Sequence, residues 1–169
     1  MKNTTRLILT ALVCTGMVAC AKKTTTPTET PEPVDTTTTT QTTDTGAYTP
    51  EDLDTDSCLR QRVVYFDFDR ADIRSESAAI LACHGKYLSD RPSAAITLEG
   101  HADERGTREY NLGLGERRGN AVSQALMANG GSAGQLNVVS YGEERPTCSE
   151  SSEDCWGKNR RVEIVYTAK

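Results

Sequence analysis

The fold of this chain is decided by residues 95–107, which read AITLEGHADERGT. Residues 95–100 alternate between apolar and polar side chains, the pattern of a strand with one buried face. A polar loop follows, and a helical pattern then runs from Arg108 to about Ala128, where Asn129 and two glycines end it. A strand that passes through a short polar loop into a helix is a building unit of α/β folds.

The same kinds of element occur on both sides of this unit. A β-rich run over residues 63–69, VVYFDFD, precedes a helical pattern that starts near Ser75 and stops before Pro92. Two further strands are expected at residues 136–141 and 161–166. The sequence therefore predicts a two-layer α/β sandwich of order βαβαβ(β), with the helices packed on a mixed four-stranded sheet.

Two carboxylates stand where strands are expected to end. Asp69 ends the first expected strand, and Asp103 lies in the loop after the second. If these two strands are parallel, both carboxylates emerge at the same edge of the sheet. Ligands of open α/β sheets sit at that edge, where helix N-termini also offer free N–H groups. We therefore expect a binding site there.

Arg118 is the charged residue that fits its surroundings least. It lies four residues from both Leu114 and Val122, on the apolar stripe of the helix that starts near residue 108. A guanidinium on a buried stripe is costly unless a carboxylate pairs with it. Asp103 is the natural partner within the chain, and the carboxylate of a ligand is the other. A purely structural ion pair is a further interpretation.

Residues 1–19 are typical of a bacterial export signal, with Lys2 and Arg6 before an apolar run too short for a permanent membrane span. Small residues precede Cys20, the pattern of a lipobox, so Cys20 is expected to carry a lipid anchor. An ordinary cleaved signal with an incidental cysteine is the alternative. Ala21 after the anchor favours the outer membrane over retention at the inner one.

Residues 20–56 are expected to form a disordered linker, and residues 57–169 the folded domain. Between Lys22 and Pro50 the chain holds fourteen threonines and four of the six prolines, with little apolar surface to bury. Eight of the 24 acidic residues lie in this linker, so the net charge of −5 belongs mostly to it. Because the domain has no surplus of basic residues, a nucleic-acid partner is not expected.

Four cysteines follow the linker, and they can pair in three ways. An exported domain favours disulfides over free thiols. We expect Cys148–Cys155, which closes a short acidic loop, and Cys58–Cys83, which ties the start of the domain to its first helix. The CxxC and Cys/His spacings of zinc sites do not occur in the sequence, so no metal is expected.

Several short motifs together resemble one known family. They are FDFD at residues 66–69, EGHADERGT at 99–107, EYN at 109–111, LGERR at 114–118, SYGE at 140–143 and KNRR at 158–161. In this order and spacing they are similar to the OmpA-like domain, and more narrowly to the peptidoglycan-associated lipoproteins of the Tol–Pal system. The resemblance covers about residues 61–167 and implies a wall-binding protein that is not an enzyme and uses no cofactor.

The resemblance also implies a ligand and the residues that hold it. The family binds the stem peptide of peptidoglycan through its diaminopimelate, so Asp103 is expected to face the ligand's ammonium and Arg118 its carboxylate. Phe68, Asp69 and Leu114 are expected to line the pocket. The domain would lie in the periplasm, link the outer membrane to the wall, exchange with a TolB-like propeller protein, and support envelope integrity and cell division.

The same residues have other interpretations. Glu99 and Asp103 would be the acid/base pair of a peptidoglycan hydrolase, and a wall-binding lipoprotein outside the Tol system would use the same pocket. His101 is interpreted as structural rather than as a metal ligand. Asn111 is expected to order the loop. Arg160 and Arg161 of the KNRR motif are expected to form ion pairs that stabilise the fold.

Overall fold

The computed structural model describes residues 46–169, so the expected signal, the lipidation site Cys20 and most of the expected linker lie outside the described residues. The strands are β1 (Val63–Tyr65), β2 (Ala95–His101), β3 (Leu136–Gly142) and β4 (Arg161–Ala168). The α-helices are α1 (Asp52–Thr55), α2 (Ala78–Asp90), α3 (Arg108–Ala128) and α4 (Glu153–Asn159), and the 3-10 helices are η1 (Ser75–Ser77) and η2 (Ala133–Gln135). Within this part of the chain, no helix has the length and apolar character needed to cross a bilayer.

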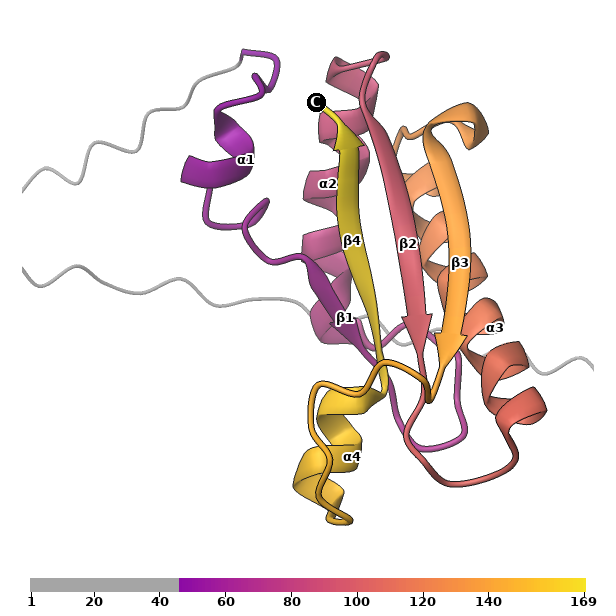
Figure 1. Ribbon diagram of the computed structural model, residues 1–169. Coiled ribbons are helices and arrows are strands. Elements are labelled where there is room, and N and C mark those ends of the chain that lie inside the picture. The colour runs from indigo at the N-terminus through magenta and orange to yellow at the C-terminus, as the bar shows by residue number, and fades with distance from the viewer. Residues whose placement is uncertain (1–45) are drawn as a thin grey trace, which may run out of the picture. The chain divides into compact units, whose positions relative to one another are not determined.

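The four strands form one sheet in the order β1-β4-β2-β3, with α2 and α3 packed on one face (Figure 1). β2 pairs in parallel with β3, and β4 runs antiparallel to both β1 and β2. β1 and β2 therefore point the same way on either side of β4, and their carboxyl ends meet at one edge. The predicted two-layer α/β sandwich with a mixed four-stranded sheet is confirmed.

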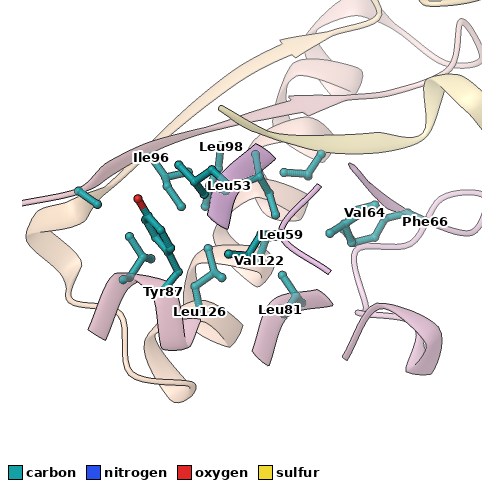
Figure 2. Close-up of a cluster of buried hydrophobic side chains, with 14 residues drawn as sticks. Leu53, Leu59, Val64, Phe66, Leu81, Tyr87, Ile96, Leu98, Val122 and Leu126 are labelled. Carbon is teal, nitrogen blue, oxygen red and sulfur yellow. The ribbon is translucent and has the colours of Figure 1, made fainter. Parts of the chain in front are cut away.

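Fourteen buried apolar side chains form one cluster between the sheet and the helices (Figure 2). They come from alternate strand positions, such as Ile96 and Leu98, and from α1, α2 and α3, such as Leu126. Burying a side chain of this size stabilises the fold by about 1.5–3 kcal/mol. Leu53 of α1 belongs to the same cluster and has no exposed surface. The folded part therefore begins before residue 57, the expected boundary.

Two elements differ from the prediction. The first strand was predicted over residues 63–69 but ends at Tyr65. The chain then leaves the sheet and turns, and Asp69 has a positive φ of 55°, which is not a strand conformation. α4 occupies part of the stretch predicted as an acidic loop. The hydroxyl of Ser152 caps this helix by accepting from the N–H of Cys155, and two acidic residues in the first turn favour a helix start.

Both predicted disulfides, Cys58–Cys83 and Cys148–Cys155, are present. The first joins the segment after α1 to α2 and so holds the start of the domain against a core helix. Closing its separation of 25 residues contributes roughly 3.5 kcal/mol in the chain-entropy account. The second ends in the first turn of α4 and fixes where that helix begins.

β2 and α3 approach so closely at one point that neither can carry a side chain there. A Cβ on Gly100 would lie 2.0 Å from the carbonyl oxygen of Gly115, and a Cβ on Gly115 would lie 2.3 Å from the hydroxyl of Ser140. Because the obstacle at Gly100 is backbone, the helix itself would have to move. This contact sets the distance between α3 and the end of β2.

Gly100→Ala is expected to destabilise the domain by about 3 kcal/mol or more, because α3 would have to lift off β2. Gly134→Ala is the matched control, since a Cβ there meets nothing within 4 Å. It should change the free energy of unfolding by less than about 0.5 kcal/mol. Urea unfolding followed by circular dichroism measures both variants, and equal stabilities would show that the close approach is not needed.

His101, at the end of β2, is buried with its ring against Tyr141, at 5.6 Å between ring centroids. Neither ring nitrogen has a hydrogen-bond partner, and Nε2 lies 4.0 Å from a carboxylate oxygen of Glu163. Burial above all, and then the cation of Arg161, lowers the pKa of His101 from 6.5 to about 4, against the opposing effect of Glu163. His101 is therefore neutral at pH 7.

Acidification is expected to destabilise the fold through this histidine. The unfolded chain takes up a proton near pH 6.5, whereas folded His101 stays neutral until about pH 4, so stability is full above pH 6.5 and falls as the pH drops toward 4. The loss at about pH 5 should reach about 2 kcal/mol.

His101→Phe keeps an aromatic ring against Tyr141 but cannot titrate. Urea unfolding between about pH 7 and pH 5 should therefore show a shallower loss of stability in this variant than in the wild type. The remaining slope is expected from His84, whose pKa is also lowered by burial. A slope identical to that of the wild type would contradict the assignment to His101.

Candidate functional site

A cavity of about 180 Å³ opens at the sheet edge where β1 and β2 end. Its walls come from the loop after β1, the loop after β2 and the first turns of α3. The lining residues are Phe68, Asp69, Asp103, Arg105, Gly106, Tyr110, Asn111, Leu114 and Arg118. All five residues predicted to form the site are among them. Between residues 46 and 169, no group of three or more His, Cys, Asp or Glu side chains lies where it could hold a metal ion.

Asp103 is almost fully buried, and two arginines hold its carboxylate. Its Oδ1 accepts from the backbone N–H and the Nε of Arg105, at 3.1 and 3.2 Å. Its Oδ2 accepts from Nη2 of Arg105 at 2.7 Å and from Nη1 of Arg160 at 3.2 Å. Burial by itself raises the pKa of Asp103, but the hydrogen bonds from Arg105 and Arg160 outweigh burial and hold that pKa below its usual value.

Asn111 orders the loop that carries Asp103. Its side-chain amide donates to the carbonyl oxygen of Asp103 at 3.0 Å and to that of Arg105 at 3.2 Å. The hydroxyl of Thr107 caps α3 by accepting from the N–H of Tyr110 at 3.2 Å. These contacts fit the role predicted for Asn111, and they fix both the loop and the start of the helix.

Arg118 has no exposed surface and donates to three backbone carbonyls rather than to a carboxylate. Its Nε bonds the oxygen of Arg70 at 2.8 Å, its Nη1 that of His101 at 2.8 Å, and its Nη2 that of Asp67 at 3.1 Å. Asp103, the expected partner, does not bond Arg118 because its carboxylate is already paired. Burial lowers the pKa of Arg118 to about 10, which leaves it charged. A guanidinium has five N–H groups, of which these bonds use three, and Arg118 is among the residues that line the cavity.

The other walls combine one more carboxylate with apolar surface. Asp69 accepts a short hydrogen bond from the hydroxyl of Tyr110. Phe68 is 55% exposed beside the cavity, whereas Leu114 is buried in its floor. A small group that carries both an ammonium and a carboxylate on an aliphatic chain would find an acceptor, donors and apolar contacts here.

Sequence reasoning missed Arg105 and Tyr110 as parts of the site. Arg105 stands two residues after Asp103 in a loop that turns at Gly106, where φ is 113°, and this short spacing was the signal available. Arg160, predicted to form an ion pair that stabilises the fold, does so with Asp103 itself. It is therefore part of the network that holds the site's carboxylate.

Comparisons with known proteins place the domain in a family. The OmpA family model matches residues 65–160. The peptidoglycan-associated lipoprotein of Pasteurella multocida is 43% identical over 121 residues, which cover 72% of this chain and 78% of the relative. The protein of the same name from Haemophilus influenzae is 45% identical over 121 residues, covering 72% of this chain and 76% of its own.

A solved structure is similar as well. The crystal structure of the peptidoglycan-associated lipoprotein from Burkholderia pseudomallei matches with a TM-score of 0.66 at 42% identity. The match covers 68% of this chain and 97% of that one. With the site residues in one cavity and these identities over the whole domain, the chain belongs to the OmpA family and, within it, to the peptidoglycan-associated lipoproteins.

Proposed function

We propose that this protein is an outer-membrane lipoprotein that binds peptidoglycan without a covalent bond and so links the outer membrane to the wall. The observation that carries the proposal is that Asp103 and Arg118 line one cavity from different elements, a buried acid and a buried guanidinium. The relatives named above are peptidoglycan-associated by name. The role is one of binding and not of catalysis.

The ligand is the zwitterionic end of diaminopimelate in the peptidoglycan stem peptide. Its ammonium pairs with Asp103, and its carboxylate accepts the two N–H groups that Arg118 has left over. Phe68 and Leu114 contact the aliphatic chain, and Asp69 adds a second negative charge near the ammonium. Hydrogen bonds to charged groups contribute about 1.5–3 kcal/mol each, which is enough for a reversible hold on the wall.

A lipid on Cys20 anchors the protein in the outer membrane, with the folded domain in the periplasm. The small residues before Cys20 and the apolar run before them support this anchor. The Thr- and Pro-rich composition of the segment that follows supports a linker between anchor and domain. Such a linker lets a domain held at one surface search for another.

The protein acts in the Tol–Pal system, where it exchanges between the wall and a TolB-like propeller protein and supports envelope integrity and cell division. The ordered set of motifs from residue 66 to residue 161 supports this assignment. The full-length protein should co-purify with the propeller protein. Wall binding without such co-purification would favour a wall-binding lipoprotein outside the Tol system.

Asp103→Asn is expected to weaken binding to purified sacculi by about tenfold or more, because the ligand's ammonium loses its anionic partner. Asp154→Asn is the matched control: Asp154 is exposed on α4 and does not line the cavity. Co-sedimentation of the full-length protein with sacculi measures both variants. Thermal unfolding checks that each one folds, because Asp103 also holds two arginines.

Two outcomes would count against the proposal. If folded Asp103→Asn sediments with sacculi as well as the wild type does, the cavity is not the wall-binding site. If the wild type releases soluble muropeptides from sacculi, and Glu99→Gln or Asp103→Asn abolishes the release, the protein is a hydrolase that uses these carboxylates.

A further inference from the structure

The carboxylate of Asp103 is already occupied in the structure. Arg105 bonds both of its oxygens, through Nε at 3.2 Å and Nη2 at 2.7 Å. Arg160 reaches the same group at 3.2 Å but is more firmly held, because it also bonds the carbonyl of Phe66 and, at 2.6 Å, the carboxylate of Glu153. Arg105 approaches Glu153 only at 3.5 Å. A ligand's ammonium can therefore reach Asp103 only by competing with a cation of the protein.

Arg105 is the more easily displaced of the two arginines. Its side chain is 29% exposed, against 9% for Arg160. Arg105 also lines the cavity, whereas Arg160 does not. Of the two arginines, Arg105 is therefore the partner of Asp103 that a ligand would displace more readily.

The guanidinium of Arg105 is held between two aromatic rings. Its central carbon lies 4.0 Å from the ring centroid of Phe68 and 4.2 Å from that of Trp156. Cation–π contacts of this kind contribute about 0.5–2 kcal/mol. Displacement from Asp103 leaves these stacking surfaces and the 3.5 Å contact with Glu153 available, so Arg105 can remain beside the cavity as a charged group.

The ring of Trp156 is itself fixed. Its indole N–H donates to Glu104 at 3.0 Å, and the same carboxylate oxygen accepts from the hydroxyl of Ser151 at 2.7 Å. Trp156 follows Cys155 of the second disulfide in α4. The helix α4, which was not predicted from the sequence, thus holds in place one of the two aromatic rings that contact Arg105.

We propose that Arg105 determines which stem peptides the site accepts: it competes for Asp103 with any ligand cation and yields only to a ligand that brings a carboxylate of its own. This inference rests on the proposed function and deepens it. The carboxylate of a zwitterionic ligand binds between Arg105 and Arg118, and so gives the displaced guanidinium of Arg105 a new partner. A plain ammonium leaves Arg105 with only its 3.5 Å contact to Glu153 in place of the bidentate bond to Asp103, a cost that disfavours the wrong ligand.

The site should accordingly prefer a stem peptide with diaminopimelate over one in which lysine, which lacks the second carboxylate, takes its place. The experiment measures dissociation constants of the full-length protein in detergent for two purified muropeptides that differ only at this residue. The wild type should prefer the diaminopimelate peptide. Arg105→Gln should reduce this preference by about tenfold, chiefly because the lysine peptide no longer meets a competing cation.

Arg108→Gln is the matched control. It removes the same charge from a neighbouring position, but Arg108 is exposed, pairs with Glu144 and does not line the cavity. It should keep the wild-type preference. Arg105→Lys is the second variant, used also if Arg105→Gln fails to fold. It keeps the charge but loses the bidentate bond and the planar stack, so it should lower the preference in the same direction.

The outcomes separate this inference from the proposed function. If the wild type binds neither muropeptide, the proposed function is wrong. If the wild type binds the diaminopimelate peptide but folded Arg105 variants keep the same ratio of affinities, the inference fails and the proposed function stands. If the Arg105 variants bind both peptides equally more weakly, Arg105 only lines the cavity, and the inference is also wrong.

Discussion

The hydrogen bonds of buried Arg118 are the interaction on which the rest of the site depends. From α3 this residue reaches the carbonyls of Asp67, Arg70 and His101, and so ties the helix to the turn after β1 and to the end of β2. A buried guanidinium is costly when unpaired, and here three acceptors stabilise it while it satisfies them in return. The cavity lies where these segments meet, and its shape follows from this contact.

The charges of the cavity are in place before a ligand arrives. Asn111 fixes the loop of Asp103 from behind, and Arg105 and Arg160 keep that carboxylate ionised and oriented. Binding then needs no ordering of the loop that carries Asp103, which reduces the entropic cost of association, although the side chain of Arg105 has to move. Because Arg105 competes with the ligand's ammonium for Asp103, the affinity for the wall stays moderate. A moderate hold suits the reversible binding of the wall that we propose.

The sequence predicted those parts that follow a period or a spacing. The strand and helix patterns predicted the two-layer α/β sandwich, and the apolar stripe of α3 identified Arg118 as a charged residue on a buried face. The partners of Arg118 could not be predicted, because backbone carbonyls leave no mark in the sequence. Leu53 was missed because one leucine in a polar segment gives no period. Arg105 was missed because the conformation of the loop decides which of several adjacent charged side chains points toward the cavity. The helix α4, in contrast, could have been predicted, because Ser152 before two acidic residues is a helix-start signal.

The central claim is that one cavity recognises both charges of a zwitterion. Its most direct test is calorimetric titration of the full-length protein with two muropeptides that are identical except for amidation of the side-chain carboxylate of diaminopimelate. Amidation removes the group assigned to Arg118 and leaves the ammonium assigned to Asp103. We expect the amidated peptide to bind at least about tenfold more weakly. Equal affinity for the two peptides would contradict the account.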